Sequence, residues 1–239
     1  MFYLFVFLGG FTSLVYQVNW QRLAAFSLGS DAGAASVVAA AFMTGLGFGS
    51  LSGGIFSKNL SKRKCIISLF FIEVTIGVLG LASLPILYQY FYLQLSGRIP
   101  FHIMGPIVFA VLTLPTLFMG VSFPLLAKAA ISEQEDAAEK VTNLYGLNTF
   151  GAALGALLGG LVLMRHFGIE MATCIAAAIN LTAGLTILPS LKTRNPAELD
   201  RKTQEKLEEA AAALRSISKS GRKILFAKAA RKEIAMQWP

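Results

Sequence analysis

A single carboxylate, Glu73, lies inside a long apolar stretch of this 239-residue sequence. It comes eight residues after Cys65, where the stretch begins, which is about 12 Å along a helix that rises 1.5 Å per residue. An ionisable group at that depth in a bilayer is costly and usually functional. Glu73 is therefore predicted to be the counter-ion of a cationic ligand. The alternative is a protonated carboxyl that hydrogen-bonds a neighbouring helix.

Four further polar side chains are candidates for the same ligand site. Asn148 lies about 8 Å along its apolar segment, at a depth comparable to that of Glu73. Tyr145 lies one turn before it, so the two are expected to line a pocket suited to an amine. Asn148 can equally serve as a hydrogen-bonding contact between helices. Tyr16 and Gln17 lie nearer the opposite side of the membrane. The alternative to ligand binding is that these two residues belong to a belt at the membrane interface.

No residue pattern in the sequence indicates catalysis, a metal or a cofactor. Cys65, Cys174, His102 and His166 each stand without a second ligand nearby, and the cysteines are predicted to be small buried apolar residues. No serine or cysteine triad, phosphate-binding loop or dinucleotide fingerprint is present. The protein is therefore predicted not to be an enzyme.

The elements that position these side chains are predicted to be membrane helices. The sequence is 55% hydrophobic and 14% charged, and its apolar runs reach the roughly 20 residues that span a bilayer core. The expected fold is all-α, with six transmembrane helices in residues 1–191. The segments are residues 2–18, 34–56, 65–91, 102–127, 141–163 and 171–191.

Two of these segments carry matching rows of glycine at every fourth residue. The rows are Gly45, Gly49 and Gly53 in one segment and Gly151, Gly155 and Gly159 in the other. Small residues at this spacing let membrane helices approach closely. Since the two segments would cross in opposite directions, the repeat predicts a 3+3 inverted arrangement, as in half of a major-facilitator transporter. The glycine rows could instead contact a partner protein.

Basic residues are distributed unevenly between the predicted loops. Lys128, Lys140 and the lysines and arginine of residues 58–64 fall on one side of the predicted bundle, together with a basic tail. Cytoplasmic loops are enriched in Lys and Arg. Both termini are therefore expected in the cytoplasm, with the chain in a bacterial inner membrane. Trp20 and Arg22 are predicted to anchor the first segment at the opposite interface.

Residues 192–239 are predicted to form a separate basic, amphipathic helical tail. Residues 191–239 hold 12 Lys and Arg against 6 Asp and Glu. Such a segment beside a membrane is expected to bind anionic lipid headgroups rather than nucleic acid. The predicted membrane-surface residues are Lys223, Lys228, Arg231, Lys232 and Trp238. A helix that docks on a partner protein is the alternative.

Four sequence motifs resemble one known family in the order that it has them. They are SLVYQVNWQRL at residues 13–23, AAAFMTGLGFGS at 39–50, LPTLFMGVSFPLL at 114–126 and LYGLNTFGAALGALLGG at 144–160. This combination is similar to the N-terminal membrane domain of spermidine-synthase-like membrane proteins, whose third helix Glu73 also fits. Gln17 stands where that family usually has Glu. No part of this sequence resembles the family's soluble aminopropyltransferase domain, so the resemblance implies the fold more than the activity.

The sequence therefore predicts a non-catalytic module that binds or transports a small solute, such as a polyamine or another amine. One alternative is an accessory subunit that packs on other membrane proteins or on copies of itself. The other is a membrane partner of a separately encoded aminopropyltransferase.

Overall fold

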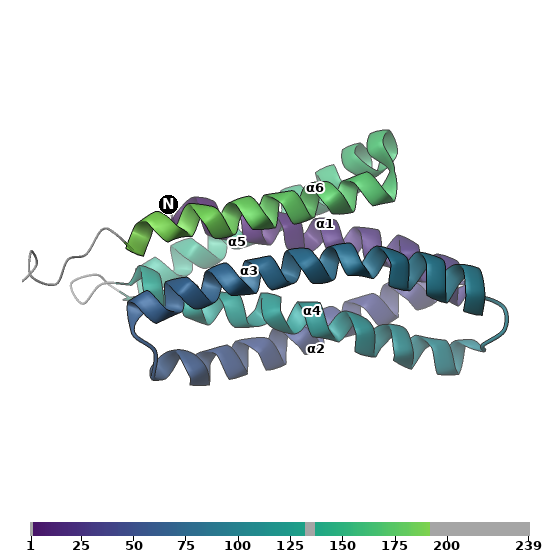
Figure 1. The fold of residues 1–239 in the computed structure, drawn as a ribbon, viewed down its shortest axis with the longest axis horizontal. Coiled ribbons are helices and arrows are strands. Elements are labelled where there is room, and N and C mark those ends of the chain that lie inside the picture. Colours follow the sequence, from purple (N-terminus) through teal and green to yellow (C-terminus); the bar gives the residue numbers. More distant parts are fainter. Residues whose placement is uncertain (1, 132–136, 192–239) are drawn as a thin grey trace, which may run out of the picture. The chain divides into compact units, whose positions relative to one another are not determined.

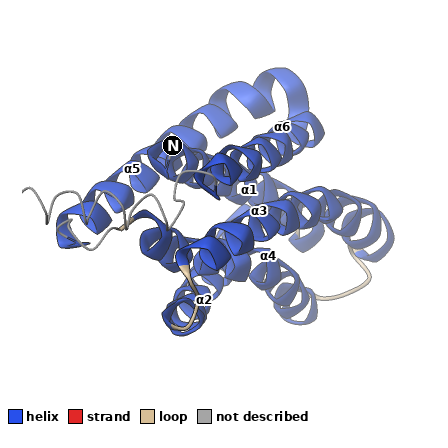
Figure 2. Ribbon diagram, turned by 60° about the vertical axis from the view of Figure 1, so that its left-hand side comes forward, coloured by secondary structure: helices blue, strands red, loops and turns tan. Residues whose placement is uncertain are grey.

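The computed structural model describes residues 2–131 and 137–191, and this part of the chain folds into helices joined by short loops (Figure 2). The elements are α1 (Phe2–Leu28), α2 (Asp31–Lys58), α3 (Lys62–Leu84), η1 (Pro85–Leu95), α4 (Phe101–Ala130), α5 (Ala137–Leu158), η2 (Gly159–Leu163), α6 (Met164–Ile187) and η3 (Leu188–Leu191). The predicted tail and its five membrane-surface residues lie outside the described residues.

Five helical stretches in the described residues are long and apolar enough to cross a membrane. They are α1, α2, Lys62–Leu95, α4 and Ala137–Leu191. The all-α fold and the membrane location predicted from composition are thereby confirmed. The protein is an integral membrane protein.

The last stretch is too long for one crossing. Its 55 residues would extend about 80 Å as one helix, whereas a bilayer core is about 30 Å thick. The helical conformation breaks at Gly168, where φ is 77° and ψ is 171°. A residue with a side chain would be strained at this φ. The turn expected at Arg165 and His166 therefore lies slightly later in the chain.

The glycine row of α5 packs against α1. A β-carbon on Gly155 would lie 2.1 Å from the carbonyl oxygen of Phe11, and one on Gly151 would lie 2.2 Å from that of Phe7. Gly159 also faces α1 but less closely, because a β-carbon there would lie 3.3 Å from Cα of Val15. Such close approach of two backbones requires glycine. Because the residue numbers rise together along the contact, α5 runs parallel to α1.

The glycine row of α2 packs against α4 in a similar manner. A β-carbon on Gly49 would lie 2.2 Å from the carbonyl oxygen of Leu117, and one on Gly53 would lie 2.9 Å from that of Val121. Gly45 faces Thr116 one turn earlier. Here too the residue numbers rise together, so α2 and α4 are parallel. Both glycine rows therefore contact helices of this chain.

The direction of α6 follows from its hydrogen bonds with α1. Thr12 bonds Asn180, and Asn19 bonds Thr173. In these two bonds the residue number rises along α1 and falls along α6, so the two helices are antiparallel. Since α5 is parallel to α1, the chain reverses direction at Gly168 and packs α6 back against α1 and α3.

Basic side chains join two loops at one end of the helices. Lys128 donates hydrogen bonds from Nζ to the carbonyls of Ser57 and Lys58, the latter at 2.7 Å. Lys62 donates from Nζ to the carbonyl of Ile131. These bonds satisfy carbonyls at the C-terminal ends of α2 and α4. The N-terminus and the end of α6 lie at this same end (Figure 1).

Three prolines lie inside α4, and the helix continues through Pro106, Pro115 and Pro124. A proline lacks the N–H that would bond the carbonyl four residues earlier. For Pro124 that carbonyl belongs to Gly120, and the hydroxyl of Ser50 on α2 donates to it at 3.4 Å. The neighbouring helix thus satisfies the acceptor that Pro124 leaves free.

Candidate functional site

A cavity of about 610 Å³ lies among the six long helices, each of which contributes to its wall. Pockets that bind small molecules have volumes of roughly 300–1,000 Å³. Four of the five residues predicted to bind a ligand, Gln17, Glu73, Tyr145 and Asn148, lie in this wall. Much of the remaining wall is apolar and includes Phe42, Met119, Phe123 and Leu126.

Glu73 is the acidic residue of this wall. Only 3% of its surface is exposed. A β-carbon on Gly184 of α6 would lie 3.3 Å from the β-carbon of Glu73, so the absence of a side chain there makes room for the glutamate. Among the described residues, none forms an ion pair or a hydrogen bond with the Glu73 carboxyl. A buried charge is normally paired, so this carboxylate is suited to a cationic ligand.

A buried hydrogen bond forms the wall beside Glu73. The hydroxyl of Thr12 on α1 lies 2.5 Å from Oδ1 of Asn180 on α6, and both side chains line the cavity. Thr12 also lies 3.0 Å from the carbonyl oxygen of Leu8. The amide group of Asn180 is therefore held at the cavity by a contact between two helices.

The backbone contact between α1 and α5 positions Asn148. A β-carbon on Gly10 would lie 2.1 Å from the carbonyl oxygen of Asn148 and 3.0 Å from its side-chain oxygen. Tyr145 lies one turn earlier, with 62% of its surface exposed. Its ring meets that of Phe123 edge-on, with centroids 6.0 Å apart. Tyr145 therefore belongs to the rim of the cavity, whereas half-buried Asn148 and Gln17 lie deeper.

Tyr16 lies behind the cavity wall. It is fully buried, its ring stacks on Trp20 at 5.4 Å between centroids, and it covers Gly80 of α3. The expectation that Trp20 anchors the chain at the interface is wrong. Its Nε1 donates a hydrogen bond to Ser83 at 2.7 Å, because α3 packs over this face of α1. Arg22 is exposed.

The two cysteines are in different environments. Cys65 is buried, whereas Cys174 is exposed, and both thiols are free. The expectation that both are buried is therefore wrong for Cys174, which lies near the exposed turn at Gly168. In residues 2–131 and 137–191, no cluster of three or more His, Cys, Asp or Glu residues could hold a metal ion.

Several buried polar residues with partners on other helices carry no prediction from the sequence. Among them are Thr12, Asn19 and Asn180. Asn180 carried the same signal as Asn148, a lone amide inside an apolar segment, and the same depth argument could have identified it. Asn19 lies just beyond the first predicted segment, residues 2–18, but α1 continues to Leu28.

Comparison with curated proteins finds a distant similarity to Polyamine aminopropyltransferase 1 of Streptomyces coelicolor, at 26% identity over 197 residues. The match covers 81% of this chain and 34% of that protein. The chain thus spans about a third of the length of this relative. No family model matches the sequence, and no solved structure matches it.

Proposed function

We propose that this protein is a non-catalytic membrane module that binds a small amine and moves it across the bilayer. The observation that carries the proposal is Glu73, a buried carboxylate without a partner among the described residues, in the wall of a cavity of ligand size. A carboxylate buried among membrane helices marks substrate or ion pathways by default.

The cavity offers complementary groups for each part of an amine. The ammonium group pairs with Glu73, and the side-chain oxygens of Asn148 and Asn180 accept further N–H bonds. The apolar wall around Phe42 and Met119 covers a methylene chain. The aromatic ring of Tyr145 at the rim attracts a cation through its π face.

Polyamines are the proposed class of amine. They carry cationic nitrogens separated by short apolar spacers, so that one ammonium can pair with Glu73 while the adjoining methylene spacer lies against the apolar wall. The name of the relative from Streptomyces coelicolor, Polyamine aminopropyltransferase 1, supports this choice over other amines. The chain spans about a third of the length of that protein.

The proposed architecture is six crossings in a 3+3 inverted repeat. The reversal at Gly168 divides the last stretch into two crossings. In this repeat α1, α2 and α3 correspond to α4, α5 and α6. The parallel pair α2–α4 then corresponds to the parallel pair α5–α1, and α3 contacts its own counterpart, α6. The basic loops at one end support cytoplasmic termini in a bacterial inner membrane.

Uptake of labelled spermidine into vesicles that contain the purified protein tests the proposed function. We expect the wild-type chain to support uptake and Glu73→Gln to reduce it to the level of empty vesicles. Glu139→Gln is the matched control, because Glu139 is exposed near the start of α5 and lies outside the cavity wall. Equal uptake by the wild-type and Glu73→Gln proteins would remove Glu73 from the mechanism.

A second candidate function is favoured by the comparison with curated proteins. The similar relative is an aminopropyltransferase, and about two thirds of its length lies outside the match. This chain would then be the membrane partner of a separate aminopropyltransferase. Purification in mild detergent separates the two functions: a stoichiometric complex with aminopropyltransferase activity supports the partner role. A complex with other membrane proteins supports an accessory subunit.

A further inference from the structure

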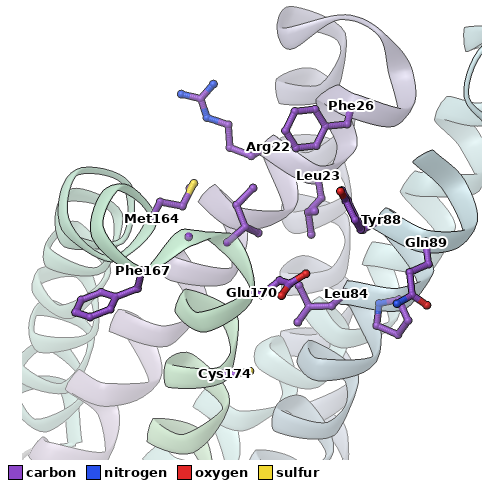
Figure 3. Close-up of a pocket in the computed structure, with 13 residues that line it drawn as sticks. Arg22, Leu23, Phe26, Leu84, Tyr88, Gln89, Met164, Phe167, Glu170 and Cys174 are labelled. Atoms are coloured by element: carbon purple, nitrogen blue, oxygen red, sulfur yellow. The ribbon is translucent and has the colours of Figure 1, made fainter. Parts of the chain in front are cut away.

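A second cavity, of about 830 Å³, lies toward the opposite end of α1 from the basic loops (Figure 3). Residues late in α1, residues at the junction of α3 and η1, and the turn into α6 form its wall. Its charged, polar and thiol side chains are Arg22, Tyr88, Gln89, Glu170 and Cys174.

This second cavity, called the outer cavity below, is lined by one carboxylate, Glu170, and one guanidinium, Arg22. Figure 3 shows the carboxylate of Glu170 pointing into the space toward Leu84 and Tyr88, whereas the guanidinium of Arg22 points away from it. Within the described part of the chain, Glu170 has no ion pair or hydrogen bond. A carboxylate beside a phenol and an amide is suited to an ammonium group.

A row of polar contacts between α1 and α6 leads from the outer cavity toward the Glu73 cavity. Thr12 and Asn180, which are 2.5 Å apart, line the Glu73 cavity. Two turns further along α1, Nδ2 of Asn19 donates to Thr173 at 3.0 Å. One turn beyond, the same antiparallel register brings Arg22 opposite Glu170 in the outer cavity.

Two buried polar atoms between the cavities have no hydrogen-bond partner in the described residues. They are Oδ1 of Asn19 and the hydroxyl oxygen of Tyr16. Leaving such atoms unpaired is unfavourable, and buried polar groups in proteins are normally satisfied. Both atoms are fully buried in this structure. Each can accept a hydrogen bond from an amine when α1 and α6 separate enough to let it pass.

We propose that the outer cavity is a second amine-binding site with Glu170 as its counter-ion. The polar row between α1 and α6 is the route from this site to the Glu73 cavity. The route rests on the proposed transport of an amine, whereas occupancy of the outer site does not depend on Glu73. The two carboxylates then act in sequence, one near each end of the path.

The thiol of Cys174 reports on this site, because it is exposed and lines the outer cavity. The full chain is reconstituted in vesicles and treated with a membrane-impermeant maleimide, and modification of Cys174 is followed by peptide mass. Spermidine is expected to slow this modification several-fold in the wild type and in Glu73→Gln. In Glu170→Gln, spermidine is expected to have no effect on the rate.

The outcomes separate the second site from the proposed function. Protection of Cys174 that survives Glu170→Gln, or no protection of the wild type, would overturn the outer site even if uptake depends on Glu73. Failure of Cys174 to react at all would overturn it too, because the cavity would then be closed to solvent. If spermidine protects Cys174 in a way that depends on Glu170, but no uptake is observed, the outer site is supported and the proposed transport is contradicted.

A separate substitution, Asn19→Leu, tests the route between the two cavities. Asn19→Leu removes one of the two unpaired acceptors between the cavities, together with the bond to Thr173, and leaves both carboxylates in place. We expect protection of Cys174 by spermidine to persist in this variant while uptake falls several-fold. The thermal midpoint of Asn19→Leu is measured alongside to establish that it folds. Unchanged uptake by a folded Asn19→Leu protein would remove the α1–α6 row from the route.

Discussion

At the scale of single residues, several buried polar side chains are held by contacts with other helices. Asn180 is 1% exposed and Thr12 is 1% exposed, and their hydrogen bond joins α6 to α1. Hydrogen bonds of this kind between membrane helices contribute about 0.6 kcal/mol on average and up to about 1.7 kcal/mol. The short Thr12–Asn180 contact therefore sets the position of an amide in the cavity and also stabilises the fold.

Thr12→Val is expected to lower the midpoint of thermal unfolding in detergent. The substitution keeps the shape of the side chain but leaves Oδ1 of Asn180 without its donor, at a cost of about 1 kcal/mol. Thr182→Val is the matched control, because Thr182 is exposed on α6 and its hydroxyl bonds only within that helix. Equal midpoints for the two variants would contradict a structural role for the Thr12–Asn180 bond.

The sequence identifies a residue when its chemistry contrasts with its surroundings. Glu73 stands out as a charge within an apolar run, and the structure places it in the cavity wall. Trp20 was misplaced because an aromatic residue close to Arg22 is typical of an interfacial belt. Its burial depends on α3, which packs over it, and no local pattern in the sequence reports which helix covers which.

At the scale of helices, the glycine rows make two specific contacts that tolerate no side chain. Gly49→Ala is expected to destabilise the α2–α4 contact, because the new β-carbon would lie 2.2 Å from the carbonyl oxygen of Leu117. Gly54→Ala on the same helix adds a methyl group in open space. The thermal midpoint should fall for Gly49→Ala and stay within experimental error for Gly54→Ala. A lower midpoint for both, or for neither, would contradict this packing.

The α1–α5 contact allows an independent test of the same kind. Gly155→Ala places a β-carbon 2.1 Å from the carbonyl oxygen of Phe11, whereas Gly146→Ala places one in open space. Chemical unfolding should show lower stability for Gly155→Ala only. If Gly146→Ala proved as damaging as Gly155→Ala, contact with α1 would not explain the glycine at residue 155.

The existence of the helices could be predicted from apolar runs, but their ends and turns could not. Segment one was expected to end at Val18, whereas α1 continues to Leu28, and neighbouring helices bury two of its later polar residues, Asn19 and Ser27. The break at Gly168 was missed by a few residues, since Arg165 and His166 are the polar residues that suggested a turn. A glycine with positive φ, such as Gly168, cannot be told from other glycines by the hydropathy of the sequence.

At the scale of the whole molecule, the proposed six crossings place the connections alternately on the two sides of the membrane. In a variant with both native cysteines changed to serine, Asn59→Cys and Arg165→Cys are expected to react with an impermeant maleimide from opposite sides. The reason is that Asn59 lies in the basic loop joined by Lys128, while Arg165 precedes the reversal at Gly168. Labelling of both positions from one side would contradict the inverted repeat.

The glycine rows can be read directly in the sequence, at Gly45–Gly53 and Gly151–Gly159. The sequence does not show whether they contact another helix of this chain or a partner protein, because both contacts need the same spacing of glycines. The choice depends on the path of the chain, which brings α4 against α2 and α1 against α5. The cavity shares this dependence, because it forms only where six helices meet.

Equilibrium binding of labelled spermidine to the purified protein in detergent tests the central claim most directly, since it isolates the pairing of an amine with Glu73. We expect the Kd of Glu73→Gln to exceed that of the wild type by about tenfold or more, a loss of at least about 1.4 kcal/mol, with Glu139→Gln unchanged. The same Kd for the wild-type and Glu73→Gln proteins would contradict the account.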